Sequence, residues 1–189
     1  MFLATIATVE SALSIKHGIP APVLSEQSLV NCDTSNNGCN GGWYSGSFKF
    51  VVDKGVFSDA SWPYKAKKEA CDIASRTKDK YSITSSQNLY GSDQALYAAL
   101  RVGPAAVALD ASDLQLYKSG YFNASCSTSF STFVNHAVVL VGSGTDGTQK
   151  YWKIRNSWGS SWGENGYFKL PVTGTNNCGI HVAAYNAIV

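Results

Sequence analysis

The sequence predicts an α+β fold, in which helices dominate the first half of the chain and an antiparallel sheet the second. Two observations support this prediction. Up to Pro104, apolar residues recur at helical spacing between capping residues and glycines. After Pro104, the pattern changes to short apolar or alternating runs that are bounded by Gly, Asn and Ser.

The segment that starts at Met1 is predicted to form a buried helix. Its apolar residues recur at intervals of four, three and four, which places them on one face of a helix: Phe2, Ile6, Val9 and Leu13. The same run resembles the apolar region of a signal peptide, but it has no basic region at its start and Glu10 interrupts it. No stretch reaches the roughly eighteen apolar residues that a membrane span requires, so we expect no membrane partner.

Three further helices are predicted from N-cap and stop signals. A serine stands where the first of them begins, and a glycine follows the second and the third. Their ranges are Ser25 to Asn31, Trp43 to Lys54 and Ser92 to Val102.

Five short strands are predicted after Pro104, because each run is apolar or alternating and ends at residues that favour turns. These runs are Ala105 to Leu109, His136 to Val141, Tyr151 to Arg155, Tyr167 to Leu170 and Ile180 to Ala184.

Length and charge narrow the class of protein. A chain of 189 residues can build one ordinary core or two small lobes around a cleft. The net charge is only +2 and the sequence has no run of basic residues, which argues against binding to nucleic acid or another polyanion. The composition therefore indicates an enzyme-sized globular chain.

Two motifs carry the chemistry. His136 lies in Val134-Asn-His-Ala-Val138, and Asn156 opens the segment Asn156-Ser-Trp-Gly-Ser-Ser-Trp-Gly-Glu-Asn-Gly-Tyr167. An imidazole can take the proton of a thiol and then protonate a leaving amine, and a side-chain carbonyl can hold the imidazole in one tautomer. We therefore predict that His136 is a catalytic base, that Asn156 orients it, and that Trp158 shields their hydrogen bond from water.

Each motif alone has a simpler explanation. A lone His in an apolar strand is usually a core residue, and an Asn before Ser-Trp is usually part of a turn. The two motifs occur together with the turn Gly38-Cys-Asn-Gly-Gly42, however, and this coincidence favours the catalytic interpretation. With these residues the sequence resembles the papain-like cysteine proteases from Met1 to Val189.

The resemblance implies a papain-like two-lobe fold and a cysteine endopeptidase, which hydrolyses peptide bonds in proteins without a cofactor or metal. Residues 1–86 would form a helical left lobe. Residues 87–189 would form a right lobe with an antiparallel, β-barrel-like sheet that carries His136 and Asn156. The sequence shows no His-bearing insertion like the occluding loop of the cathepsin B branch, which favours an endopeptidase over a carboxydipeptidase.

The catalytic thiol is the part of the family pattern that this sequence does not show. The alignment with the family puts the catalytic Cys immediately before Met1, at a helix N-terminus where the helix dipole favours a thiolate. The family builds its oxyanion hole from that Cys N–H and from a Gln a few residues upstream. We therefore expect that an N-terminal segment is missing and that this chain alone is inactive.

The cysteine count agrees with this expectation. The sequence has five cysteines, and an odd number leaves one thiol unpaired in an oxidising compartment. The resemblance implies the disulfides Cys32–Cys71 and Cys126–Cys178 and leaves Cys39 unpaired, since its family partner lies just before the nucleophile. An ordinary buried free thiol at Cys39 is the alternative.

The resemblance also places the substrate-binding residues. Small residues at Ala108 and Ala183, with no acid at the floor of the main pocket, lead us to expect a bulky apolar side chain two residues before the scissile bond. Two glycines would let the substrate backbone bind as a short extended strand. The whole set is Gly41, Gly42, Trp43, Tyr44, Ala108, Val134, Asn135, Ala137 and Ala183.

Destination and partners follow from weaker signals. The sequon Asn123-Ala-Ser125 makes Asn123 a glycosylation candidate, and two disulfides favour a secreted protein or one in a lysosome-like or digestive vacuole. The expected partners are polypeptide substrates and cystatin-like or propeptide inhibitors. We expect a monomer that binds no nucleic acid.

Three interpretations remain open. The first is a protease whose N-terminal part is missing, and the second is a non-catalytic homologue that binds peptides or acts as a decoy. The third is a two-chain protein whose missing segment is supplied separately. Intact residues at His136, Asn156 and Trp158 favour the first.

Overall fold

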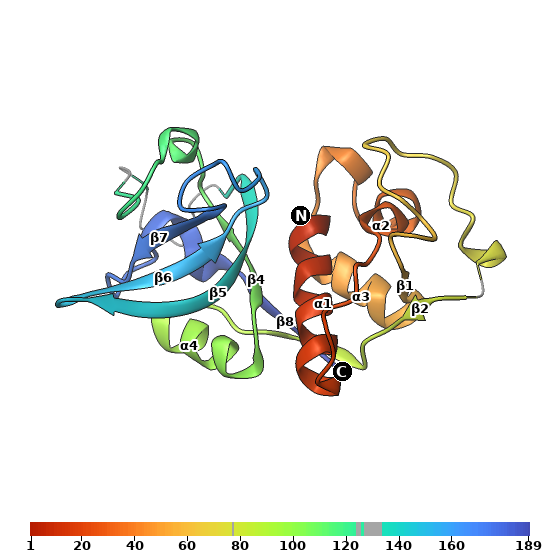
Figure 1. Ribbon diagram of the computed structural model, residues 1–189, viewed down its shortest axis with the longest axis horizontal. Helices are drawn as coiled ribbons and strands as arrows, with labels where there is room; N and C mark the ends of the chain where they lie inside the picture. Colours follow the sequence, from red (N-terminus) through yellow and green to blue (C-terminus); the bar gives the residue numbers. More distant parts are fainter. Residues whose placement is uncertain (77, 124–125, 127–133) are drawn as a thin grey trace. The chain divides into compact units, whose positions relative to one another are not determined.

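The computed structural model describes residues 1–76, 78–123, 126 and 134–189. The chain divides into two compact units, one of Met1–Gln87 with Ala187–Val189 and one of Asn88–Asn186. The first contains helices α1 to α3, and the second contains α4 and most of a β-sheet (Figure 1). Within the described residues, no helix is long and apolar enough to cross a membrane.

The first helix, α1 (Phe2–His17), is buried along the predicted face. The four residues of the predicted stripe are at most 7% exposed, which confirms the prediction. Thr8 is buried as well, and its hydroxyl donates to the carbonyl of Ala4 at 2.9 Å, so this polar group is satisfied inside the helix. The helix ends at Gly18, which adopts the left-handed conformation and donates its N–H to Ser14.

Two further helices of the first unit, α2 (Glu26–Cys32) and α3 (Tyr44–Lys54), both contact α1. The predicted N-cap of α2 is confirmed, because the side chain of Ser25 accepts a hydrogen bond from the N–H of Ser28 at 3.2 Å. A 3-10 turn, η1 (Gly38–Asn40), lies between the two helices. Strands β1 (Val56–Phe57) and β2 (Lys80–Tyr81) form an antiparallel pair, and η2 (Ile73–Ser75) lies between them in the chain.

The sheet has six strands in the order β3-β8-β4-β5-β6-β7. The inner pairs are antiparallel, and strand β5 pairs with β4 on one side and β6 on the other. In the described part of the chain the sheet is open, with β3 and β7 at its edges, and it does not close into a barrel. The strands are β3 (Ser85–Asn88), β4 (Ala105–Leu109), β5 (His136–Asp146), β6 (Gln149–Arg155), β7 (Tyr167–Pro171) and β8 (Ala184–Ile188).

Helix α4 (Asp93–Val102) lies beside β5, and its Tyr97 ring packs against Trp152 of β6 with the ring centroids 4.5 Å apart. The core of this unit is formed by side chains of α4, the sheet and the turn η3 (Leu114–Leu116). It also contains Cys178, which is fully buried and bonded to Cys126. The α+β prediction is therefore confirmed.

The prediction of a strand from Ile180 to Ala184 is wrong. Residues Asn177–Val182 form the 3-10 segment η4, and strand β8 begins only at Ala184. Two residues directly before the predicted strand, Cys178 and Gly179, have φ values of 53° and 82°, and the 3-10 segment that contains them continues to Val182. The other four predicted strands are present, although β5 continues to Asp146 beyond the predicted end.

Candidate active site

The sheet brings His136 and Asn156 to one end of two neighbouring strands. His136 is the first residue of β5 and stands opposite Leu109 of β4. Asn156 directly follows β6, and its backbone N–H donates to the carbonyl of Gly166 at 2.9 Å. Because β5 and β6 are antiparallel, with Val139 opposite Arg155, the start of one strand lies near the end of the other.

Their side chains form a hydrogen bond. The His136 Nε2 lies 2.9 Å from the Asn156 Oδ1, and the same oxygen accepts the backbone N–H of Ser157 at 2.8 Å. A backbone N–H can only donate, so the atom it meets must be the amide oxygen and not the amide nitrogen. The Nε2 of His136 therefore carries the proton in the neutral ring, and Nδ1 keeps the lone pair of a base.

Aromatic side chains cover this hydrogen bond. The ring of Trp158 lies against the His136 ring, with centroids 4.9 Å apart and planes 34° apart. Trp162 meets Trp158 edge to face at 5.2 Å and also packs on Phe168. Asn156 is only 7% exposed. A hydrogen bond that is excluded from water in this way is electrostatically stronger than one at the surface.

The glycines of this segment fold it into a compact loop. Gly163 has a φ of 56°, and a Cβ there would lie 2.7 Å from the carbonyl of Tyr167. Hydrogen bonds from Gly166 to Trp162 and from Glu164 to Tyr167 close the turn. The glycine at position 163 thus has a structural cause, because a side chain there would collide with the carbonyl of Tyr167 and open the turn that follows Trp162.

The environment sets the basicity of the imidazole. Burial lowers the pKa of His136 below its ordinary value, and the hydrogen bond to Asn156 raises the pKa and offsets part of that effect. The ring is thus kept neutral near pH 7, with a free lone pair on Nδ1. A neutral imidazole of fixed tautomer is suited to accept a proton from a thiol or a water molecule.

Comparison with known proteins identifies the family. The pattern of the "Papain family cysteine protease" matches residues 2–188. The chain belongs to the papain family of cysteine proteases.

Papain-family relatives are similar over most of this chain. A "Digestive cysteine proteinase 3" of Homarus americanus is 43% identical over 168 residues, which are 83% of this chain and 50% of the relative. A "Cathepsin L-like proteinase" of Phaedon cochleariae is 36% identical over 186 residues, covering 96% of this chain and 56% of the relative. The chain therefore spans about half the length of these curated relatives.

Solved papain-family structures share the fold. Bromelain from Ananas comosus, in complex with the E64 inhibitor, is 39% identical with a TM-score of 0.89, and the match covers 100% of this chain and 87% of that one. The proform of the ragweed pollen allergen Amb a 11 is 33% identical with a TM-score of 0.90, covering 100% of this chain and 58% of that one.

The predicted pocket residues of the second unit lie in strands β4 and β5 and in the segments that precede β5 and β8. Ala108 stands opposite Ala137, one position along from the pairing of Leu109 with His136, and is 4% exposed. Ala183 follows η4 and is 1% exposed. The side chain of Asn135 is engaged with the turn after β4, where it accepts the N–H of Ala111 at 2.8 Å. Val134, just before it, is half-buried.

The predicted pocket residues of the first unit lie in the turn that leads into α3 and at the first residue of that helix. Gly42 has a φ of 155°, and a Cβ there would lie 2.0 Å from the Asn36 Oδ1, so glycine is required. The same oxygen accepts the N–H of Trp43, whose ring is 41% exposed. Gly41 has open space where a Cβ would stand. Tyr44 is 1% exposed and packs on Phe48, so its side chain belongs to the core.

The five cysteines are placed as the resemblance implied. The structure contains the disulfides Cys32–Cys71 and Cys126–Cys178. Cys39 is unpaired and exposed in η1, which argues against the alternative of a buried free thiol. It lines a hollow of about 150 Å³ together with the start of α1.

Sequence reasoning missed a second buried histidine. His181 is 2% exposed, and its Nε2 lies 2.8 Å from the Asp93 Oδ1. No local sequence pattern predicts this pair, because 88 residues separate His181 from Asp93. His181 also lies in the run that was predicted to be a strand.

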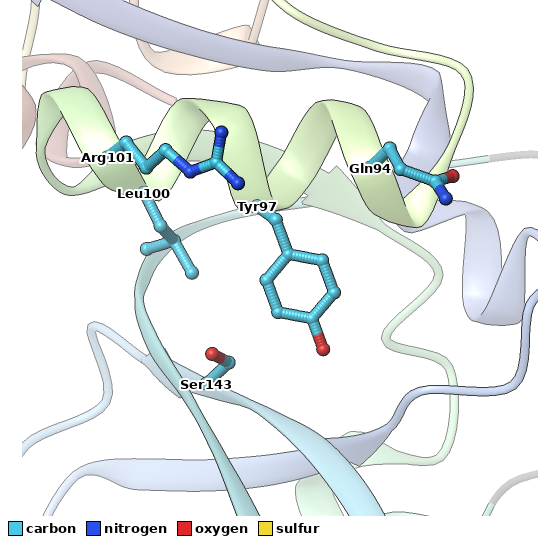
Figure 2. Close-up of a pocket in the computed structure, with 5 residues that line it drawn as sticks. All are labelled: Gln94, Tyr97, Leu100, Arg101 and Ser143. Carbon is cyan, nitrogen blue, oxygen red and sulfur yellow. The ribbon is translucent and has the colours of Figure 1, made fainter.

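A separate hollow of about 430 Å³ lies between α4 and β5. Figure 2 shows Tyr97 and Leu100 extending from the helix on the side where Ser143 lies. The other lining residues are Gln94, Leu100 and Arg101. Because neither His136 nor Asn156 lines it, this hollow does not belong to the candidate active site.

Proposed function

We propose that this chain is the part of a papain-family cysteine endopeptidase that supplies the catalytic base, and that His136 and Asn156 are its catalytic pair. The observation that carries the proposal is the bond between His136 Nε2 and Asn156 Oδ1, which is fixed by the N–H of Ser157. It leaves Nδ1 of His136 as the base. Trp158 supports the pair by covering it.

The chemistry follows from this tautomer. The Nδ1 of His136 takes the proton of a thiol, and the resulting thiolate attacks the carbonyl carbon of the peptide bond. The imidazolium then gives its proton to the leaving amine. In the second half of the reaction, Nδ1 takes a proton from water, which attacks the thioester and frees the enzyme. Asn156 orients the ring throughout and exchanges no proton.

We propose that the thiol belongs to a residue that directly precedes Met1 in the longer protein. Four of the five cysteines are in disulfides. Cys39 stands in a three-residue 3-10 turn and not at the start of an α-helix, where a thiolate is stabilised. Helix α1 starts at Phe2 and has no acidic residue in its first turn, so its N-terminus suits an anion. The oxyanion donors would come from the same preceding segment.

For the substrate, we propose a bulky apolar side chain two residues before the scissile bond. Ala108 and Ala183 are small, which leaves room, and neither carries charge to attract a basic side chain. Gly41 and Gly42 would receive the substrate backbone beside the exposed ring of Trp43. Val134, Asn135 and Ala137 are the further residues of the second unit that we propose to contact the substrate. Tyr44 would act only by holding Trp43 in place.

The names of relatives support a location for the whole protein. Similar proteins are called digestive or cathepsin L-like proteinases, and we propose that this one acts in a digestive or lysosome-like vacuole or after secretion. Similar structures include an E64 complex and a proform. We therefore propose polypeptide substrates and cystatin-like or propeptide inhibitors as partners of a monomer with lobes at residues 1–86 and 87–189.

A non-catalytic, peptide-binding homologue is the second candidate. It is favoured by the fact that none of the five cysteines of this chain stands at the N-terminus of an α-helix as an activated thiol. Such a protein would keep the pocket residues and bind peptides without cutting them.

One experiment separates the two candidates. The 189-residue chain and a chain extended upstream with Gln and Cys at the family spacing are assayed with a fluorogenic dipeptide that carries Leu or Phe two residues before the cut, in reducing buffer at mildly acidic pH. We expect no turnover from the first and turnover from the second, blocked by a thiol-directed epoxide. Extension with Ser in place of Cys is the control and should be inert. A folded, extended chain that is inert would favour the peptide-binding candidate.

A further inference from the structure

A hollow of about 450 Å³ lies in the second unit, and neither His136 nor Asn156 lines it. It falls in the range of roughly 300–1,000 Å³ that is typical of small-ligand sites. It is lined by Asp113, Leu116, Tyr117, Lys118, Ser119, Tyr121, Phe122 and Asn123. Aromatic and aliphatic side chains therefore lie together with charged and hydroxyl groups.

The lining of this hollow combines a strongly exposed leucine with the asparagine of a glycosylation sequon. The Leu116 side chain is 82% exposed, more than any other exposed large hydrophobic residue of the described chain. Asn123, in the same lining, is the acceptor of the sequon Asn123-Ala-Ser125. Ala124 and Ser125 lie outside the described residues. An exposed leucine alone is ordinary. This leucine, however, lines the same hollow as a glycosylation acceptor, so a sugar attached to that acceptor would cover it.

Asn123 is exposed. The residue before it is held by a backbone hydrogen bond, and the next described residue after it is in a disulfide. The N–H of Phe122 donates to the carbonyl of Lys169 in β7 at 2.8 Å, and Cys126 is bonded to the buried Cys178. The exposed acceptor therefore lines the hollow directly after a hydrogen-bonded backbone position, which lowers the entropy cost of ordering an attached group there.

We propose that Asn123 carries an N-linked glycan whose first N-acetylglucosamine lies in this hollow and covers Leu116. The apolar face of the sugar would pack on Leu116 and the aromatic rings, and its hydroxyl and acetamide groups would face Asp113, Lys118 and Ser119. The proposal shares with the proposed function only the secretory route, which the two disulfides also support. It does not depend on catalysis.

The modification is a group transfer without oxidation or reduction. The amide nitrogen of Asn123 forms a bond to the anomeric carbon of an oligosaccharide that is carried on a lipid pyrophosphate. The bond from that carbon to the pyrophosphate oxygen breaks, the lipid pyrophosphate leaves, and the amide nitrogen loses one proton.

The test uses the chain secreted from a eukaryotic cell line. After folding, one endoglycosidase trims the glycan to a single N-acetylglucosamine, and a second enzyme removes it completely from a parallel sample. We expect an intact mass that shows one glycan, which Ser125→Ala abolishes. We also expect the single-sugar form to melt about 2–4 °C above the sugar-free form, the shift of a modest contact in a protein of this size.

A matched pair of variants locates the sugar. Leu116→Ser should remove the difference in Tm between the single-sugar and sugar-free forms, because the apolar contact is lost while the glycan remains. Val23→Ser changes another strongly exposed residue, 70% exposed and outside the hollow, and should leave the difference intact. Absence of a glycan, a glycan without a Tm difference, or a difference that survives Leu116→Ser would each overturn the proposal. None of these readouts involves protease activity.

Discussion

His181 donates from its Nε2 to the Oδ1 of Asp93 at 2.8 Å, although 88 residues separate them. The other carboxylate oxygen of Asp93 accepts the N–H of Gly174 at 3.0 Å, and the N–H of His181 donates to the Asn176 side chain at 2.7 Å. The start of α4 is thereby tied to the segment that leads into Ala183.

Asp93→Asn is expected to destabilise the protein by about 1–3 kcal/mol, because a largely buried hydrogen bond to a charged group is replaced by a weaker one. Urea denaturation measures the free energy of unfolding. Asp53→Asn is the control, since Asp53 forms an exposed pair with Lys49 four residues away, and such a pair contributes about 0.3–0.5 kcal/mol. Equal losses in the free energy of unfolding for the two substitutions would show that the buried pair stabilises the protein no more than the exposed pair does.

The tautomer and pKa of His136 can be measured in the chain as it stands. Heteronuclear NMR should show the proton on Nε2 in the neutral ring and a pKa below the ordinary histidine value of about 6.5, because burial disfavours the charged form. Asn156→Ala should lower the pKa further, since the bond to Asn156 favours the charged ring. The sequence has three histidines, so His17→Gln and His181→Gln assign the signals. A pKa above the ordinary value would contradict the prediction.

The sign of the resulting pH dependence of stability follows from the same shift. The folded-state pKa lies below the unfolded one, so the unfolded chain binds more protons between the two values. The contribution of His136 to stability is complete above the unfolded pKa and is lost as the pH falls through the folded pKa. His136→Gln should flatten this part of the stability profile in urea denaturation at a series of pH values.

The roles within the pair are tested in the chain extended with Gln and Cys. His136→Ala should remove nearly all activity, about 10⁴-fold or more in kcat, because the base and the nucleophile act as a unit. Asn156→Ala should cost less, about 10- to 100-fold, since it misorients the ring without removing it. Full activity after His136→Ala would disprove the assignment.

Trp158→Ala exposes the hydrogen bond between His136 and Asn156 to water. We expect kcat/KM of the extended chain to fall about 5-fold, which corresponds to the loss of about 1 kcal/mol from one hydrogen bond. Tyr90→Ala removes an aromatic ring that is 62% exposed and lines none of the candidate sites, and it should have no effect. Equal losses in both variants would indicate a general effect on the fold.

Peptide mapping without reduction should recover Cys32–Cys71 and Cys126–Cys178 and leave Cys39 unpaired in the 189-residue chain. The double substitution of Cys32 and Cys71 by Ala should lower the free energy of unfolding by about 2–4 kcal/mol, because the unfolded chain loses a constraint. Cys39→Ala should leave it nearly unchanged. A bond from Cys39 to Cys32 or Cys71 would contradict the pairing.

Most helices were predictable from the sequence because their signals are local. The stripe of α1, the N-cap Ser25 and the terminating Gly55 each lie within a few residues of the feature that they specify. The last strand was misplaced because its start depends on the left-handed backbone at Cys178 and on a side chain of Asn176, which apolar periodicity does not reveal. The extension of β5 to Asp146 likewise depends on its partner strand, which begins at Gln149.

The candidate site also has a part that the sequence predicted and a part that it could not predict. His136 and Asn156 were found through motifs, and the sheet brings their side chains within hydrogen-bonding distance. Spacing could not show that Tyr44 is buried, that Asn135 is engaged by the turn after β4, or that His181 pairs with Asp93. Each of these depends on contacts between residues that are distant in the sequence.

The amide at Asn156 has a consequence for work in acid. A carboxylate in the same position would gain a proton as the medium became more acidic, and its hydrogen bond to the imidazole would then weaken. A carboxamide does not titrate, and its oxygen is fixed by the peptide N–H of Ser157. The direction in which His136 presents Nδ1 is therefore the same in an acidic vacuole and in neutral fluid, and only the charge of the ring varies between them.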